Sequence, residues 1–367
     1  MEKQDRIVER FLEYVQIDSP TREEKEFKDR LKLDLEELGL EVYEDDAGEK
    51  VGSNSGNLIG KLKGDGNQTI LFSAHMDTVS PGRGIKPEIR DGIIYSDGTT
   101  VLGADDKAGV ASIIEMLTIL KEENISHHNL EISFNIYEEG GLFGSKNLDY
   151  SMFEADFGII VDSSSAPGYT ILEAPAQNKI NVKFKGKTAH AGVAPEAGIS
   201  AIQIAAEAIS NMKLLRIDEE TTANIGFIGG GGPTNIVTDE VEIKAEARSL
   251  DNDKLKAQTD HMVQCVKDAQ AKYGIEAEIE VEEAYKAFRV TEDSIPAQAV
   301  KAACERAGLE FVPGKSGGGS DANNFNQNGI PSVNIGVGYK NAHTTEEFIP
   351  ISALHDMTKL LLEIAKA

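Results

Sequence analysis

TILFSAHMD, residues 69–77, joins a short apolar run to a histidine and an aspartate. Its first part, residues 69–74, has the length and apolar character of a buried strand, and it delivers His75 and Asp77. Residues two apart on a strand face the same way, so Asp77 is placed to fix the ring orientation and the tautomer of His75. Alone, a histidine near a strand end also has an ordinary structural explanation, so other segments must decide its role.

Four other segments carry residues that bind metals. Asp105 lies in GADDKAG (103–109), which opens a helix, and Glu138 and Glu139 lie at the end of a strand. Asp162 follows the apolar run 159–161, and His343 follows a final strand. Each has an ordinary alternative, such as helix capping for Asp105 or a surface loop for His343. As a set, two imidazoles and three carboxylates suit a pair of zinc-like ions that share one carboxylate. The sequence therefore predicts a hydrolytic two-metal site with these ligands: His75, Asp105, Glu139, Asp162 and His343.

Short apolar runs alternate with helical patterns in residues 1–177. Strands are expected at 57–62, 69–74, 130–137 and 157–161, and a long helix at 107–123. This alternation predicts an α/β catalytic domain whose mixed sheet is flanked by helices. The dipeptide Asp91-Gly92 predicts a hairpin before the long helix. Thr21 and Glu24 predict a capping box on a helix that ends at Gly39.

A different pattern occupies residues 178–288. In order, it contains an alternating strand at 179–185, a helical stripe from Ile199 to Met212, strands at 223–228 and 240–248, a helix at 255–273 and a strand at 277–281. This β-α-β-β-α-β order resembles the ferredoxin-like α+β motif. All five proposed ligands lie outside it, so we expect an inserted domain. Residues 1–177 and 289–367 are then the two parts of the catalytic domain.

Composition excludes several classes of function. The chain has 367 residues, with 62 acidic and 37 basic side chains and a formal charge of −25. Binding to nucleic acid requires a basic stripe, which this sequence lacks. No apolar run approaches the ~18 residues of a membrane span. Cys265 and Cys304 lie in helical patterns and support neither a disulfide framework nor a thiolate zinc site. We therefore expect a cytoplasmic protein without nucleic-acid or membrane partners.

Taken together, the motifs identify a family. The segments that carry the resemblance are SAHMD (73–77), GADDK (103–107), EEG (138–140), Asp162, KGKTAH (185–190) and AHTTEEFIP (342–350). In this order, they resemble the dinuclear zinc metallopeptidases that include peptidase T, aminoacylase, carnosinase and the succinyl-diaminopimelate desuccinylase. The wording of GADDKAG and EFIP is most similar to the peptidase T branch.

The resemblance implies how the ligands divide between two zinc ions. Asp105 would bridge both ions, with His75 and Asp162 on one ion and Glu139 and His343 on the other. Cobalt or manganese would also accept these nitrogen and oxygen ligands.

The resemblance also implies catalytic and substrate-binding residues. Glu138 would be the general base, taking a proton from a metal-bridging water and passing it to the leaving amine, and Asp77 would belong to the same catalytic set. His190 is similar to a lid histidine that binds the oxyanion, often from the partner subunit of a dimer. Asn235 and Arg248 would hold the substrate's backbone and carboxylate, a task that suits the planar fork of arginine. The inserted domain is thus expected to be a lid and to form a homodimer.

The residue at position 162 bears on the substrate. Family members that act on free amino termini tend to carry aspartate there, as this chain does, whereas carboxypeptidases and deacylases tend to carry glutamate. This favours an aminopeptidase that hydrolyses short peptides. A carboxypeptidase or an N-acyl-amino-acid deacylase of the same family is the alternative. A metal-binding protein without activity is a remote one, because the full set of ligands and Glu138 is present.

Overall fold

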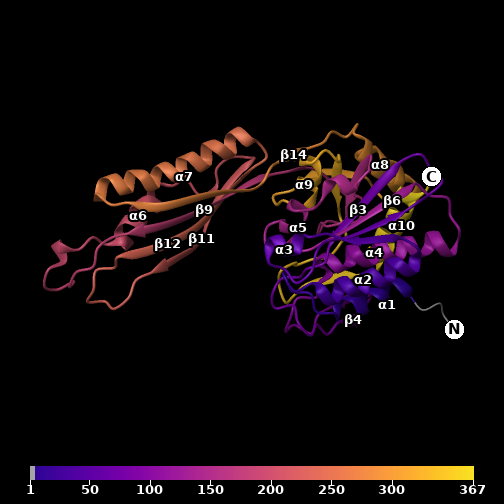
Figure 1. Ribbon diagram of the computed structural model, residues 1–367, viewed down its shortest axis with the longest axis horizontal. Helices are drawn as coiled ribbons and strands as arrows, with labels where there is room; N and C mark the ends of the chain where they lie inside the picture. Colours follow the sequence, from indigo (N-terminus) through magenta and orange to yellow (C-terminus); the bar gives the residue numbers. More distant parts are fainter. Residues whose placement is uncertain (1–4) are drawn as a thin grey trace. The chain divides into compact units, whose positions relative to one another are not determined.

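The computed structural model describes residues 5–367, which form two compact units (Figure 1). The first unit contains the residues up to Glu173, then Phe288–Ser316 and Ser320–Ala367. The second contains Ala174–Ala287 and the short piece Gly317–Gly319. In sequence, the second unit therefore interrupts the first.

A mixed sheet forms the centre of the first unit. Within residues 5–367, nine strands belong to it, and its main path runs β1-β2-β6-β3-β7-β16-β8-β14, with β15 beside β8. The strands are β1 (Glu41–Glu44), β2 (Leu58–Leu62), β3 (Thr69–His75), β6 (Asn129–Asn135), β7 (Phe157–Ile160), β8 (Tyr169–Ala174), β14 (Phe288–Arg289), β15 (Val312–Lys315) and β16 (Ser332–Ile335). The central neighbours β6, β3 and β7 are parallel to one another. The predicted α/β class with a mixed sheet and helices is confirmed.

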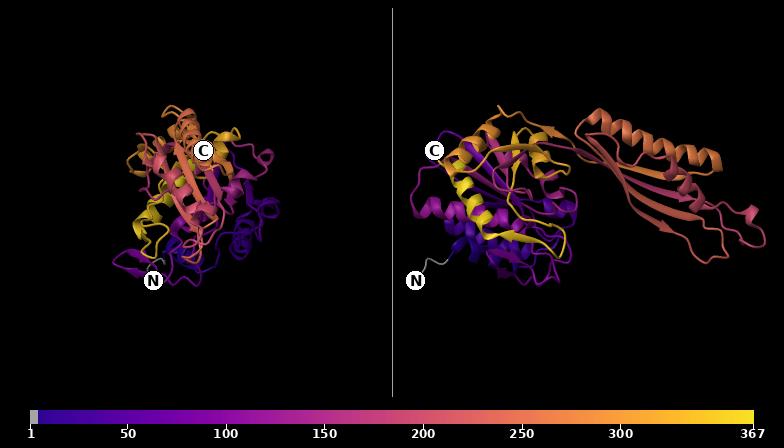
Figure 2. Two further views of the ribbon diagram at one scale, coloured as in Figure 1. Left: turned by 90° about the vertical axis from the view of Figure 1, so that its left-hand side faces the viewer. Right: turned by 180° about the vertical axis from the view of Figure 1, so that it is seen from behind.

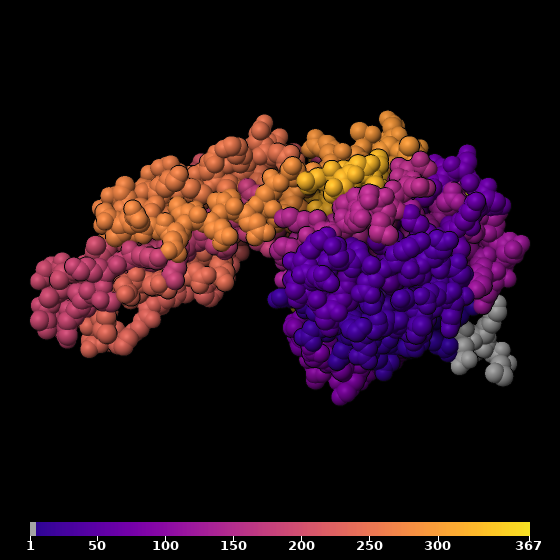
Figure 3. Space-filling model, viewed as in Figure 1, coloured from indigo at the N-terminus to yellow at the C-terminus, as the bar shows by residue number. Residues whose placement is uncertain are grey.

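Helices cover this sheet. They are α1 (Arg6–Val15), α2 (Lys25–Leu38), α3 (Ala47–Val51), α4 (Ala104–Glu122), α5 (Phe143–Lys146), α8 (Ile295–Ala307), α9 (Asp321–Gln327) and α10 (Ile351–Ala365). Helix α4 packs on β3, and α1, α2 and α10 pack on α4. Figure 2 shows the C-terminal α10 beside the other helices of this unit, and in Figure 3 the N-terminal residues make up most of its near face. Because α4 lies between the sheet and other helices, nearly all of its side chains are buried.

A small sheet lies beside the start of α4. Strands β4 (Glu88–Arg90) and β5 (Ile93–Tyr95) form the predicted hairpin, and β17 (Phe348–Pro350) pairs with β5. Asp91 and Gly92 have φ values of 51° and 75°, as a tight turn with two left-handed residues requires. The pairing of β17 with β5 brings the C-terminal part of the chain to the loop that leads into α4.

The predicted capping box before α2 is wrong, although the helix ends at Gly39 as expected. The Thr21 hydroxyl donates to Asp77 Oδ2 over 2.8 Å instead of capping the helix. Glu24 is fully buried, and its carboxylate accepts the backbone N–H groups of Arg22 and Tyr137. Both residues are therefore used in tertiary contacts that a local motif does not reveal.

The second unit has its own sheet and core. Five strands in residues 174–287 form an antiparallel sheet in the order β10-β11-β12-β9-β13. They are β9 (Ala176–Lys185), β10 (Leu215–Arg216), β11 (Thr221–Gly230), β12 (Glu240–Ser249) and β13 (Ala277–Tyr285), and the helices are α6 (Ala201–Asn211) and α7 (Asn252–Tyr273). Both helices pack against β9 and β12 and against each other. The apolar residues of β9 and β12 that point at the helices are buried, while the alternate residues are polar.

None of the helices described between residues 5 and 367 is long and apolar enough to cross a membrane.

Candidate metal centre

Three parallel strands of the first unit bring distant residues together. His75 ends β3, Glu138 and Glu139 follow β6, and Asp162 follows β7. Because β6, β3 and β7 are adjacent and parallel, their carboxyl ends meet at one edge of the sheet. Asp105 reaches this edge from the start of α4, where it and Asp106 have non-helical backbone angles.

The Asp105 carboxylate lies between two histidines. Its Oδ1 atom is 3.1 Å from Nε2 of His75, and its Oδ2 atom is 3.3 Å from Nε2 of His343. Asp162 Oδ1 is 3.8 Å from the same His75 nitrogen, and Glu139 Oε2 is 2.9 Å from the His343 nitrogen. The five predicted ligands therefore form one cluster, with Asp105 in its middle.

His343 reaches the cluster from a loop. It has a φ of 65°, and its side chain is 54% exposed, whereas His75 is buried. The prediction that His343 follows the last strand is wrong, because β17 comes after it. Lys340 and Phe348 exchange backbone hydrogen bonds across this loop and close its base. The more exposed side of the cluster is thus the His343 side.

The cluster has an excess of negative charge. Burial, followed by repulsion from Asp162, raises the pKa of Glu138 well above its usual range, and burial also raises the pKa of Asp162. In contrast, hydrogen bonds from His343 and His75 overcome burial and hold the pKa of Asp105 well below its usual range. Hydrogen bonds to Asp105 and Glu139 raise the pKa of His343 to about 10. A bound cation would reduce the repulsion between the carboxylates that crowd around the two imidazoles.

The residues present fit divalent cations. Two groups of three residues could each hold an ion, because the donor atoms within each group lie within 4.8 Å of one another. One group is His75, Asp105 and Glu139, and the other is His75, Asp106 and Asp162. Among residues 5–367, the Oε1 atom of Glu139 is buried and has no hydrogen-bond partner. A bound cation would satisfy this oxygen, and a donor set of carboxylates and imidazoles suits zinc-like ions. The ligand assignment itself stays a prediction.

Asp77 supports this cluster from behind. It is fully buried, and its carboxylate accepts the backbone N–H groups of Glu138 and Glu139 over 2.9 and 3.3 Å. His75 Nδ1 is 2.9 Å from the carbonyl oxygen of Asp77 and 3.5 Å from its carboxylate. The ring contact expected from the sequence is therefore made mainly through the backbone of Asp77, and the carboxylate holds the Glu138–Glu139 turn.

Three supporting residues were missed by the sequence analysis. Asp106 accepts the backbone N–H groups of His75 and Gly109, so both of its oxygens are already engaged. The Asn334 side chain bonds both the N–H and the carbonyl of Asp162, and the Tyr339 hydroxyl donates to Asp162 Oδ1 over 3.1 Å. Asn334 is a polar residue in a buried strand, which is a signal that can be read from sequence. Tyr339 offers no such signal.

The three predicted residues of the inserted segment belong to the second unit. His190 and Asn235 are exposed and lie on neighbouring segments, since His190 forms a backbone bridge with Ile236. Arg248 is half-buried, and its guanidinium pairs with Glu246 at 2.9 and 3.0 Å. Their roles toward a substrate stay predictions.

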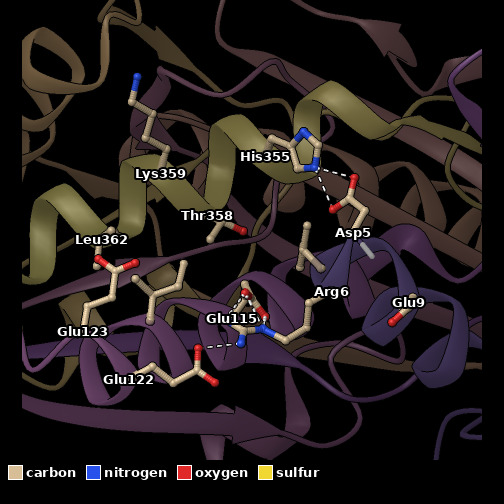
Figure 4. A pocket seen from close by; sticks show the side chains of 12 residues that line it. Asp5, Arg6, Glu9, Glu115, Glu122, Glu123, His355, Thr358, Lys359 and Leu362 are labelled. Carbon is tan, nitrogen blue, oxygen red and sulfur yellow. Dashed lines mark hydrogen bonds and ion pairs between the residues drawn. The ribbon is translucent and has the colours of Figure 1, made fainter. Parts of the chain in front are cut away.

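A cavity lies elsewhere in the first unit. It measures about 860 Å³ and is bounded by α1, α4 and α10 (Figure 4). Ion pairs between His355 and Asp5 and between Arg6 and Glu122 cross it. None of the five predicted ligands lines this cavity. The chemistry of the carboxylate and histidine cluster, rather than cavity size, therefore identifies the candidate site.

Comparisons with known proteins show the family of this chain. The family model described as "Peptidase family M20/M25/M40" matches residues 71–367. The uncharacterized protein YqjE of Bacillus subtilis (strain 168) is 48% identical, over 99% of this chain and 98% of that protein. The crystal structure of aminopeptidase PepT from Bacillus cereus is 48% identical with a TM-score of 0.90, covering 99% of this chain and 98% of that one. That of a tripeptidase from Staphylococcus aureus is 43% identical with a TM-score of 0.94, covering 98% and 97%.

These matches confirm the resemblance drawn from the motifs. The matched region includes all five predicted ligands and Glu138, and the aligned structures span nearly the whole chain. The protein is a peptide hydrolase, and its chain belongs to peptidase family M20/M25/M40.

Proposed function

We propose that the protein is a two-zinc aminopeptidase that hydrolyses short peptides with a free amino terminus. The observation that carries this proposal is the position of Asp105, whose two oxygens lie 3.1 and 3.3 Å from two different imidazoles. A carboxylate between two histidines suits a ligand shared by two cations. When bound, two such ions polarise the scissile carbonyl and lower the pKa of an attacking water.

Glu138 is the proposed general base. Its backbone is anchored by Asp77, and its carboxylate lies in the field of Asp162 and His75. It would accept one proton from the attacking water as the new C–O bond forms. It would return that proton to the leaving amine as the C–N bond breaks, which leaves Glu138 unchanged after each turnover. A positioned base of this kind contributes about 10²–10⁴-fold to the rate.

Two observations favour an amino terminus as the recognised end. The similar proteins of known structure are described as an aminopeptidase and a tripeptidase. Asp162, the position at which aspartate favours aminopeptidases, lies within the carboxylate and histidine cluster.

The second unit is proposed to act as a ferredoxin-like lid and as the homodimer contact. Its strand order β11-β12-β9-β13, with two helices packed on β9 and β12, supports this topology. His190, Asn235 and Arg248 are the residues proposed to contact the oxyanion and the substrate. We also propose a cytoplasmic location, which suits Cys265 and Cys304 as buried thiols.

The test compares three forms of one tripeptide, with free ends, with an acetylated amino end and with an amidated carboxyl end. Each is incubated with zinc-loaded protein, and the products are identified by mass spectrometry. An aminopeptidase releases the first residue from the free peptide but not from the acetylated one. Slower release from the amidated peptide would agree with a carboxylate held by Arg248. Cleavage of the acetylated peptide would instead assign the protein to the carboxypeptidases or deacylases of the family. Absence of any cleavage would overturn the hydrolase itself.

A further inference from the structure

Glu347 is a buried carboxylate at the base of the His343 loop. Only 1% of its surface is exposed. Its Oε2 atom accepts the backbone N–H groups of Leu102 and Gly103 over 2.7 and 2.8 Å, and its Oε1 atom accepts that of Asp105 over 2.9 Å. One side chain thus holds three backbone donors of the loop that presents Asp105, and it lies 242 residues from Asp105 in sequence.

The loop that Glu347 holds has an unusual backbone. Gly103 has a φ of 72°, and Asp105 and Asp106 depart from helical angles although they lie within the first turn of α4. The first N–H groups of a helix have no partner within the helix. A carboxylate from another segment satisfies such groups and is favoured by the helix dipole. Glu347 therefore supplies from outside what the local sequence 102–105 does not supply for itself.

Glu347 is also tied to His343. The two residues share the loop that Lys340 and Phe348 close, and β17, which starts at Phe348, pairs with β5 ahead of α4. From this loop, Glu347 accepts the backbone N–H of Asp105, and His343 contacts the Asp105 side chain at 3.3 Å. The backbone and the carboxylate of Asp105 are thus held by the same loop.

Similar contacts connect the other segments of the cluster. Asp106 accepts the N–H of His75, and Asp77 accepts the N–H of Glu138. In each case, a buried carboxylate that follows one predicted ligand accepts a backbone N–H from a segment that carries another residue of the cluster. The contact of Glu139 with His343 at 2.9 Å connects the segment after β6 to the His343 loop. Glu347 is the carboxylate of this kind that acts on Asp105.

We propose that Glu347 is a positioning residue that sets Asp105 between the two imidazoles and thereby sets the affinity of the site for divalent cations. This inference rests on the proposed metal-dependent function. Replacing Glu347 by glutamine keeps its size but turns an N–H₂ group toward backbone donors, so at least one of the three hydrogen bonds is lost. Residues that orient ligands in this way typically change metal affinity by about 10–100-fold when they are mutated.

The matched control is Glu131. It is also a buried glutamate, 3% exposed, and its carboxylate accepts the backbone N–H of Glu154 over 3.1 Å. It lies near the start of β6, whereas the cluster lies beyond the end of that strand. Glu131 also pairs with Lys61 Nζ at 3.1 Å, so Glu131→Gln disturbs both a buried hydrogen bond and an ion pair without touching the site.

The experiment titrates Zn²⁺ into metal-free wild type, Glu347→Gln and Glu131→Gln against a chromophoric chelator, and records the visible spectrum of each Co²⁺ form. We expect Glu347→Gln to bind Zn²⁺ about 10–100-fold more weakly, with a changed Co²⁺ spectrum, and Glu131→Gln to match wild type. Glu347→Asp, which keeps the charge but sets it back by one methylene, should fall between the two. It also carries the test if Glu347→Gln fails to fold.

Two outcomes would overturn the role of Glu347. One is a wild-type Zn²⁺ affinity in both Glu347 variants. The other is an equal loss of affinity in Glu131→Gln, which would mean that general destabilisation is responsible. Neither depends on peptide cleavage. If Zn²⁺ affinity depends on Glu347 but the wild-type protein cleaves no peptide, the proposed function is overturned and the positioning role stays intact.

Discussion

The carboxylate of Asp77 accepts a hydrogen bond from the backbone N–H of Glu138, with 2.9 Å between Oδ1 and the nitrogen. Its other oxygen receives the hydroxyl of Thr21 at 2.8 Å and the N–H of Glu139 at 3.3 Å. The carbonyl of Asp77 faces the ring of His75. One buried residue thus connects a predicted metal ligand to the turn that carries the proposed base.

Asp77→Asn should therefore weaken both metal binding and turnover. The amide keeps one acceptor but places an N–H₂ group among backbone donors, so the turn at Glu138 shifts. We expect Zn²⁺ affinity and kcat/KM to fall by about 10–100-fold. Asp45→Asn is the control, because Asp45 also accepts two backbone N–H groups but lies outside the cluster. An unchanged Zn²⁺ affinity in Asp77→Asn would contradict the connection.

Glu138→Ala should remove turnover while leaving the metal content unchanged. Glu138 is outside the proposed ligand set, so its loss removes the proton acceptor alone. We expect kcat to fall by at least about 10²-fold, measured on the free tripeptide, with metal content measured by elemental analysis. Activity close to wild type would reject Glu138 as the base, and loss of bound metal would show that it is a ligand.

Removing the metal should destabilise the first unit. Crowded carboxylates repel each other in the metal-free cluster, and a ligand that binds only the folded state stabilises it by mass action. At a free Zn²⁺ concentration of 100 times Kd, the free energy of unfolding should rise by about 2.7 kcal/mol. Thermal unfolding with Zn²⁺ and with a chelator measures the difference. A melting temperature that does not change as the Zn²⁺ concentration is raised would show that the cluster does not bind Zn²⁺.

Gly109→Ala should destabilise the protein even though alanine favours helices. A Cβ atom at Gly109 would lie 2.3 Å from the carbonyl oxygen of Val161 and 2.4 Å from Oδ1 of Asp106. Overpacking of this kind costs about 1–3 kcal/mol, which exceeds the gain of about 1 kcal/mol in helix propensity. Urea unfolding measures the change, with Gly226→Ala as the control because a Cβ there meets nothing within 4 Å. A more stable Gly109→Ala would refute the close approach of α4 to Val161.

Stability should fall as the pH rises above about 10, the usual pKa of tyrosine. Tyr14 is fully buried and donates to Asp34 over 2.6 Å, and burial followed by repulsion from Asp34 raises the pKa of Tyr14 well above its usual range. Above pH 10 the unfolded chain releases this proton while the folded chain keeps it, so unfolding becomes easier by up to about 1.4 kcal/mol per pH unit. Urea unfolding of wild type and Tyr14→Phe between pH 9 and 11 tests this. Identical slopes would contradict it.

Much of the first unit can be predicted because its signals are local. The apolar run before His75, the hairpin dipeptide Asp91-Gly92 and the stop at Gly39 each act through a few neighbouring residues. The capping box at Thr21 failed for the opposite reason. Its hydroxyl has a partner 56 residues away, and that contact replaces the local one.

From the sequence alone, the ends of the parallel strands can be located, because strand length and apolar pattern are local. These strand ends carry three of the candidate ligands, His75, Glu139 and Asp162. In contrast, the acidic residues that accept backbone N–H groups next to these ligands can be identified only from the tertiary structure. Glu346 and Glu347 are adjacent and chemically identical, yet Glu346 is exposed and Glu347 is buried against Leu102, Gly103 and Asp105. That difference arises when β17 pairs with β5, a contact between segments more than 240 residues apart whose partner no local pattern specifies.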